Sequence, residues 1–351
     1  MFKTFRLITV ISLILVAVAT SFAQDDEQLK KALLEAAKAG NAPKVKELLD
    51  QGAFIAARDE QTGKTALHLA VASGNVDSIN HMLYAYRSFT VDKASFQQMK
   101  PEDRQGWING LKDFVLDRDG NTPLVDAIKG GKPEVLQLVL SAGFMTPDLV
   151  NLPNNSTNPV LLETVKQGDL NMVRLLIENG ANVNATDSLG VTALMHAANM
   201  DRVDIASLLI EKGANVNVKT KSGWPILAGI AEKGPSTEIV RLLLEKGANV
   251  NEIAPQGATA LLQNLRSNRQ TMAVLQLMLD KGANVNAADI GGTTPLHRAA
   301  FHPNGEEFVK LLLDRNANPN LKNNAGQTPL TIAIKSGNTK SADLLKARGG
   351  Q

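Results

Sequence analysis

The side chains that most often carry out chemistry are sparse in this sequence. There is no cysteine, which excludes disulfide bonds, thiolate metal sites and a cysteine nucleophile. The five histidines are scattered, and no helix carries an H-x-x-x-H pair or a cluster of histidine with carboxylates. A metal site needs several ligands held together. We therefore predict no metal site.

Phosphate-binding and nucleophile motifs are also incomplete. The letters GKT at 63–65 match the end of a P-loop, but that motif needs a glycine five residues before Gly63, where this chain has Arg58. A turn before a helix explains the same letters. No G-x-S-x-G motif occurs. The expectation is a protein that is not an enzyme and has no cofactor.

The first 23 residues have the three-part pattern of a secretory signal. Lys3 and Arg6 precede an apolar run at 7–19, and small Ser21 and Ala23 occupy the positions that a signal peptidase reads. This pattern predicts cleavage between Ala23 and Gln24. A retained membrane anchor is the alternative, but the apolar run is shorter than the ~20 residues that span a bilayer. We expect no membrane span after cleavage.

The charge balance excludes one class of partner. The chain has 37 basic and 35 acidic residues, and removal of Lys3 and Arg6 with the signal leaves 35 of each. Nucleic-acid binders usually carry a basic excess, so no nucleic-acid partner is predicted. An N-x-T triplet at Asn184 lies in a loop where a glycan would obstruct folding. Together with the signal, this favours a bacterial protein that is periplasmic or secreted, and we expect a monomer.

The clearest feature of the sequence is a repeat. The letters GANVN occur at 180–184, 213–217, 247–251 and 282–286, with a worn copy, NANPN, at 316–320. The copies are separated by 33, 34, 35 and 34 residues, and the leucine of a T-x-L phrase moves in step from Leu161 to Leu330. A fixed period of this size is typical of a stacked repeat array.

Residues 187–219 show how one unit is expected to fold. Asp187–Gly190 is a turn, and Thr192 can cap the first helix of the unit. A second helix follows at Val203–Lys212, with apolar residues at helical spacing. Gly213 ends that helix in the left-handed conformation. Val216 is the apolar residue of a polar loop and should point inward. The recurring phrase is therefore predicted to be structural.

These motifs carry a resemblance to a known family. The pattern G-x-T-x-L-x-x-A-A, a second helix of V-x-L-L-L type and then GANVN resembles the ankyrin repeat. TALH at 65–68, TPLV at 122–125 and TPLH at 294–297 match its first helix, and EIVRLLLEKGANVN at 238–251 matches its second half. The resemblance covers about residues 26–351. It implies an all-α solenoid of about nine helix-turn-helix units with β-hairpin-like loops.

Unit boundaries follow from the same phrases. After the signal at 1–23, residues 24–58 form an N-terminal capping repeat, and 59–351 hold repeats two to nine. The region at about 85–116 is an insertion rich in aromatic residues, with an expected amphipathic helix. It can pack onto the array as a small core of its own, or form a lid over the binding face.

The resemblance also implies where a partner binds, namely at the hairpin tips and at the exposed ends of the first helices. Trp224 is expected at an exposed tip, where tryptophan often marks a binding hot spot. The alternative is that Trp224 folds back onto Pro225 and the next tip. The candidate binding residues, including one from the insertion, are Arg118, Leu189, Val191, Met200, Lys221, Trp224, Lys233, Arg266, Ile290, Phe301, His302 and Trp107.

Three functions fit this sequence. The first is a non-enzymatic scaffold that binds a partner protein in the bacterial cell envelope, as an inhibitor, an immunity protein or a chaperone. The second is an enzyme or small-ligand-binding protein with a site between the 85–116 insertion and the array. The third is a passive structural protein held at the membrane by a retained leader. The sequence does not identify the partner, because fold alone does not encode function.

Overall fold

The computed structural model describes residues 26–87, 100, 103, 106, 115–143, 145–152, 158–267 and 272–351. The predicted signal with Ala23 and Gln24, most of the 85–116 insertion and Trp107 lie outside the described residues. The predictions made for those segments therefore remain predictions.

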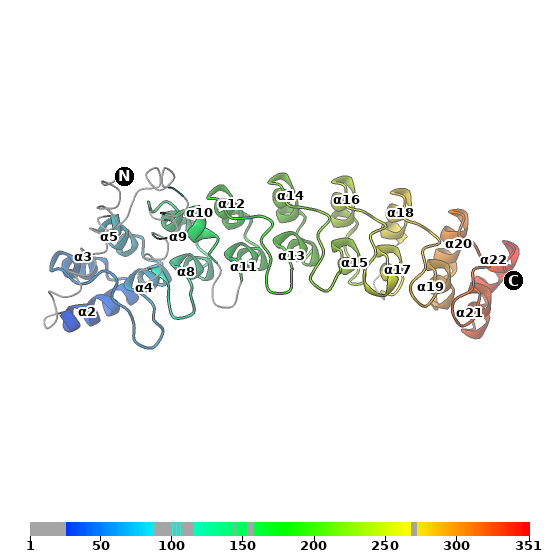
Figure 1. Cartoon of the computed structure of the whole chain (residues 1–351), viewed down its shortest axis with the longest axis horizontal. Helices are drawn as coiled ribbons and strands as arrows, with labels where there is room; N and C mark the ends of the chain where they lie inside the picture. The colour runs from blue at the N-terminus through cyan, green and yellow to red at the C-terminus, as the bar shows by residue number, and fades with distance from the viewer. Residues whose placement is uncertain are drawn as a thin grey trace. The chain divides into compact units, whose positions relative to one another are not determined.

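The regular elements of the described residues are helices, and most of these helices follow one another as nine pairs (Figure 1). The pairs are α2 (Asp26–Lys38) with α3 (Ala42–Asp50), α4 (Ala66–Ser73) with α5 (Val76–Arg87), α8 (Pro123–Lys129) with α9 (Pro133–Leu140), α11 (Val160–Gln167) with α12 (Leu170–Glu178), α13 (Ala193–Asn199) with α14 (Val203–Glu211), α15 (Ile226–Ala231) with α16 (Thr237–Glu245), α17 (Ala260–Asn264) with α18 (Met272–Asp280), α19 (Pro295–Phe301) with α20 (Glu306–Asp314), and α21 (Pro329–Lys335) with α22 (Thr339–Ala347). Two short elements, α10 (Pro147–Val150) and the 3₁₀ turn η1 (Pro255–Gly257), lie between pairs.

The chain divides into two compact units. Unit 1 comprises Met1–Glu163 with Arg174–Ala181, and unit 2 comprises Thr164–Val173 with Asn182–Gln351. In unit 1, α4 packs between α2 and α8, and α5 packs against α3 and α9. In unit 2, the first helices α13, α15, α17, α19 and α21 pack in sequence, while α16 packs between α14 and α18 and α20 packs against α22. Each unit is thus a layer of first helices on a layer of second helices.

The first helices begin where the sequence predicts. Thr192 is the N-cap of α13, and its hydroxyl accepts a hydrogen bond from the Met195 amide. Thr259, Thr294 and Thr328 cap their helices in the same way. Pro225 takes the cap position of α15, which therefore has no side-chain cap bond.

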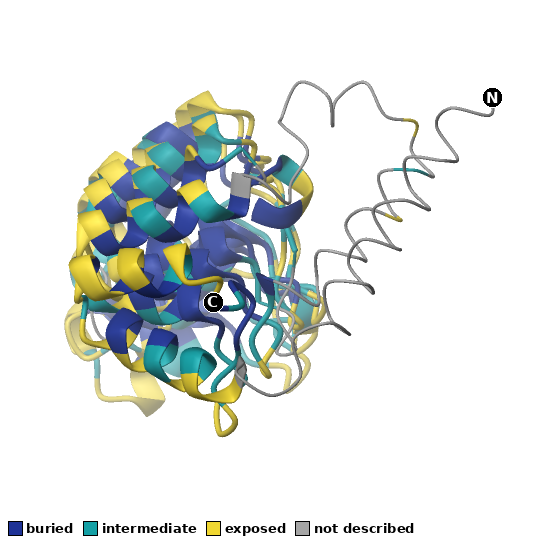
Figure 2. Cartoon of the chain, turned by 90° about the vertical axis from the view of Figure 1, so that its left-hand side faces the viewer, coloured by how far each residue is buried: buried dark blue, intermediate teal, exposed yellow. Residues whose placement is uncertain are grey.

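The second helices end where the GAN phrase predicts. Gly213 has φ +92°, in the left-handed region that glycine adopts without a Cβ penalty. Val216 is buried, as expected from its place in a polar loop. The leucine of each T-x-L phrase is the centre of the core, with no more than 8% of its surface exposed from Leu67 through Leu330. Buried positions lie where the two layers face each other, and exposed positions lie on the outside (Figure 2).

The asparagines of the GANVN phrases link each repeat of unit 2 to the next one. Asn217 Nδ2 donates to the Gly247 carbonyl at 3.0 Å, and Asn217 Oδ1 accepts from the Asn249 amide at 2.8 Å. Asn184, Asn251 and Asn286 make the same pair of bonds in their own repeats. The backbone groups that these side chains bond belong to the neighbouring repeat.

Two buried histidines, His68 and His297, have structural hydrogen bonds on both ring nitrogens. His68 Nδ1 accepts from the Thr65 amide, and its Nε2 lies 3.0 Å from the Asn121 carbonyl oxygen of the next repeat. His297 repeats this arrangement with Thr294 and Gln327. A neutral ring with its proton on Nε2 satisfies both bonds. Burial lowers the pKa of both histidines.

Candidate protein-binding surface

Hairpin tips before the first helices are joined to one another by single backbone hydrogen bonds. Isolated antiparallel bridges such as Thr186 to Thr192 close the hairpins. The Lys221 amide donates to the Leu189 carbonyl at 2.9 Å, and the Ile290 amide donates to the Gln256 carbonyl at 2.9 Å. The Asn324 amide continues the series onto the Gly291 carbonyl. These bonds form a tip ladder that joins the tips of repeats five and six, and those of repeats seven, eight and nine.

The tip ladder is interrupted between the sixth and seventh repeats. Pro255 occupies the position equivalent to Lys221 and Ile290, and proline has no N–H to donate. Trp224 fills this junction instead. Its side chain is half-buried and packs against Ala228, Ala254 and Ala258.

This packing corrects the expectation that Trp224 stands exposed at its tip. The small side chains Ala254 and Ala258 of the next tip leave room for the indole, which folds back as the alternative prediction described. The contact replaces the missing backbone bond with apolar burial. Binding of a partner by Trp224 is untested.

Arg118 also joins two tips, here in unit 1. Its amide donates to the Thr62 carbonyl at 3.2 Å. Its guanidinium donates to the Gln61 carbonyl at 2.7 Å and to the Glu60 carbonyl at 2.6 Å. Arg118 is exposed, but its donors serve the neighbouring tip. Arg118, which the sequence suggested as a binding residue, therefore also has a structural role in joining two tips.

Several large apolar side chains of unit 2 are exposed at tips and at the ends of first helices. Leu189 and Ile290 at the tips are 67% and 72% exposed, and Phe301 at the end of α19 is 67% exposed. Met200, which follows α13, and Ile253, which precedes a tip, are also exposed. These exposed side chains are the apolar candidates for contact with a partner.

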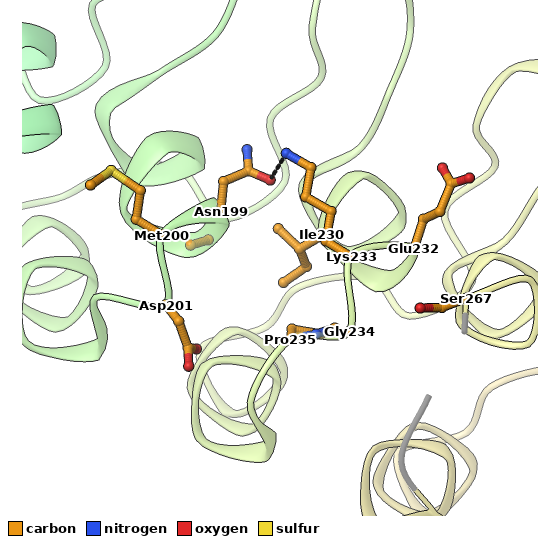
Figure 3. Close-up of a pocket in the computed structure, with 10 residues that line it drawn as sticks. Asn199, Met200, Asp201, Ile230, Glu232, Lys233, Gly234, Pro235 and Ser267 are labelled. Carbon is orange, nitrogen blue, oxygen red and sulfur yellow. Dashed lines mark hydrogen bonds between the residues drawn. The ribbon is translucent and has the colours of Figure 1, made fainter. Parts of the chain in front are cut away.

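A hollow of about 530 Å³ lies at the ends of the first helices of repeats five to seven (Figure 3). Ile230 points into it, whereas Met200 and Glu232 extend away from its centre. Lys233 Nζ donates to Asn199 Oδ1 at 3.0 Å on one side, and Ser236 Oγ donates to Asp201 Oδ1 at 2.5 Å. The lining residues are Ala198, Asn199, Met200, Asp201, Ile230, Glu232, Lys233, Gly234, Pro235 and Ser267.

Comparison with known protein families decides the identity of the array. A model described as ankyrin repeats (3 copies) matches residues 8–93, 146–220 and 267–351, which is more than half of the chain. The chain belongs to the ankyrin-repeat family. Ankyrin repeats are in general protein–protein interaction modules.

Several curated proteins resemble parts of the ankyrin array. Neurogenic locus notch homolog protein 1 of Mus musculus is 28% identical over 160 residues, which is 46% of this chain and 5% of that protein. A transient receptor potential cation channel subfamily A member 1 homolog of Caenorhabditis elegans is 26% identical over 185 residues, 53% of this chain and 13% of that protein. The E3 ubiquitin-protein ligase KEG of Arabidopsis thaliana is 26% identical over 173 residues, 49% of this chain and 9% of that protein. The chain spans only a small part of each of these relatives.

The remaining predicted binding residues of the ankyrin array differ in how far their side chains are exposed to solvent. Lys221, Lys233 and Arg266 are exposed. Val191 is half-buried, and its amide donates to Asp187 Oδ1. His302 is also half-buried, its ring meets Phe308 edge-on with centroids 5.7 Å apart, and its Nδ1 accepts from the Asn304 amide.

Sequence reasoning missed Ile253 and the hollow. Ile253 occupies the position that Thr186 and Lys219 occupy in the two preceding repeats. An apolar residue at a position that is otherwise polar was the signal by which the sequence could have identified it. The available signal for the hollow was the length of the turn Glu232–Ser236 between α15 and α16. The proposed enzyme or ligand site beside the 85–116 insertion falls mostly outside the described residues.

The described residues meet the requirements of neither a metal site nor a membrane span. Among them, no group of three or more histidine, aspartate or glutamate side chains is placed to hold a metal ion. No helix in the described part is long and apolar enough to cross a membrane.

Proposed function

We propose that this ankyrin array is an exported bacterial protein that binds a partner protein in the cell envelope through the tips and first-helix ends of unit 2. The exposed apolar residues Leu189, Ile290 and Phe301 are the observation that carries the proposal. The tip ladder and the asparagine bonds hold these residues in place before binding. Such preorganisation lowers the cost of ordering the surface on association.

The proposed role is to hold the partner, as an inhibitor, immunity protein or chaperone does. Which of these three roles applies depends on which protein the array binds. The proposed localisation rests on the signal-like pattern at 1–23 and the cleavage expected after Ala23. It is tested by N-terminal sequencing of the protein from the soluble envelope fraction, where the chain should begin at Gln24.

The partner is tested by capture with the tagged chain in envelope extract of the source organism. A triple variant, Leu189→Ser, Ile290→Ser and Phe301→Ser, should lose at least ten-fold of the captured partner, because apolar anchors dominate interface energies. The matched control is Val76→Ser with Tyr84→Ser, which removes exposed apolar area from α5. Equal capture by the wild type and the triple variant, with helicity retained, would refute the assignment.

A further inference from the structure

The hollow coincides with a lengthened turn in the repeat pattern. Gly213 lies 21 positions after the first-helix cap Thr192 in the fifth repeat, and Gly247 lies 22 positions after the equivalent Pro225 in the sixth. The extra length falls between α15 and α16, where Glu232–Ser236 replaces the shorter Met200–Arg202 turn. In a repeat array, a departure from the pattern at a surface is where specific function is expected.

Side-chain bonds from the lengthened turn to the fifth repeat fix the shape of the hollow. The Lys233–Asn199 bond and the Ser236–Asp201 bond both connect the two turns. Ser236 also caps α16 by accepting from the Ile239 amide, which anchors this contact to a helix. The opening between the turns is therefore built before any ligand arrives.

Asp201 adds evidence of specialisation at the same place. It has φ +57°, in the left-handed region, where the equivalent residues of neighbouring repeats are Gly168 and Gly234. A non-glycine residue in this conformation is costly and persists where its surroundings require it. Here the carboxylate of Asp201 accepts the Ser236 hydroxyl, which a glycine cannot do.

The chemistry of the lining defines an occupant. Ile230, Ala198 and Pro235 supply apolar parts of the lining. Lys233 binds only a neutral amide and has no carboxylate partner among the described residues. Asp201 is engaged by Ser236, and Glu232 extends away from the centre. The hollow thus offers apolar contact beside a cation that lacks an anion.

We propose that this hollow anchors one bulky apolar side chain of the partner, with an adjacent carboxylate of the partner bound to Lys233. The proposal rests on the protein-binding function and adds the chemistry of the bound segment. The volume of about 530 Å³ falls in the range of sites that enclose small ligands. An aromatic or large aliphatic side chain beside Asp or Glu fits both features.

Indole-3-acetate is a direct probe, because it joins a large apolar ring to a carboxylate. The full chain, with methyl-labelled methionine and isoleucine, is titrated and followed by NMR. Saturable shifts are expected at the Met200 and Ile230 methyl groups, with affinity in the millimolar range of small fragments. Signals are assigned with Met200→Leu and Ile230→Val.

Comparator probes and variants separate the two parts of the proposal. Indole, which lacks the carboxylate, should bind about five-fold more weakly than indole-3-acetate, and Lys233→Met should remove that difference. Lys246→Met, at an exposed lysine after α16, should leave it unchanged. Absence of saturable shifts at Met200 and Ile230 would overturn the proposal, and equal binding of both probes to the wild type would overturn its acidic element. Partner capture is measured separately, so a failure here is distinguishable from failure of the proposed function.

Discussion

At the scale of single residues, glycines set where each repeat turns. Gly213 and Gly190 both have positive φ, but their surroundings differ. A Cβ on Gly213 would meet nothing within 4 Å, whereas a Cβ on Gly190 would lie 2.7 Å from the Lys221 amide nitrogen. Gly213 thus serves backbone conformation alone, and Gly190 also permits the close approach of two tips.

This difference predicts two unequal substitutions. Gly213→Ala should lower the free energy of unfolding by about 1–2 kcal/mol, the cost of placing an L-residue in the left-handed region. Gly190→Ala should cost more, because the methyl group also displaces the amide that donates to Leu189. Urea unfolding followed by circular dichroism measures both. Equal losses would show that the tip contact contributes little.

The buried histidines predict a dependence on pH. Their folded-state pKa values are lowered by burial, so the unfolded chain binds protons more readily than the folded one. The contribution to stability is complete above the unfolded pKa of about 6.5 and is lost as the pH falls below it toward the lowered folded value. Carboxylates titrate at lower pH, with unfolded pKa values near 4.

The measurement is urea unfolding at intervals between about pH 7.5 and 5.5. The wild type should lose stability across this range. A double variant, His68→Gln with His297→Gln, should be less stable at pH 7.5 but should show a flatter profile. A wild-type free energy of unfolding that is constant over the range would contradict the assignment.

At the scale of elements, the loops after the second helices connect the repeats as firmly as the helices do. Asn217→Ala removes two hydrogen bonds to the next repeat, to Gly247 and Asn249. At about 0.5–1.5 kcal/mol for each of the two bonds, the expected loss of stability is about 1–3 kcal/mol.

The control is Asn171→Ala on α12. Asn171 is exposed, and its side chain has no hydrogen-bond partner among the described residues, so the change should stay within about 0.5 kcal/mol. Thermal unfolding of both variants makes the comparison. Similar losses in the two would mean that the Asn217 bonds exchange freely with water.

The helices and loops also show which structural features can be predicted from the sequence. The Thr192 cap, the Gly213 stop and the inward Val216 were predictable, because each follows from local backbone chemistry that the repeat displays many times. The place of Trp224 was not decided by its own repeat, since the room for its indole comes from Ala254 and Ala258 of the next one. The additional residue in the Glu232–Ser236 turn was visible as a spacing, but the hollow beside it depends on how two turns pack.

At the scale of the whole molecule, stability should be transmitted between neighbouring repeats. In unit 2, α16 packs against α14 and α18. In an array each repeat mainly contacts its neighbours, so a local loss of packing should spread over a short range. A globular domain with a single core would instead lose protection throughout.

Leu243→Ala tests this at the centre of unit 2. Leu243 lies on α16 and is fully buried, and truncation of such a leucine costs about 3–5 kcal/mol. Amide hydrogen exchange read by mass spectrometry should show the largest loss of protection in α14, α16 and α18, a smaller loss in α20 and α22, and none in α2–α5. Leu67→Ala on α4 is the reciprocal variant and should affect α2, α5 and α8 while leaving α16 protected. Equal loss along all the described helices in either variant would show that the array unfolds as one cooperative unit. A graded loss would mean that the binding surface of unit 2 can be altered without disturbing the first repeats.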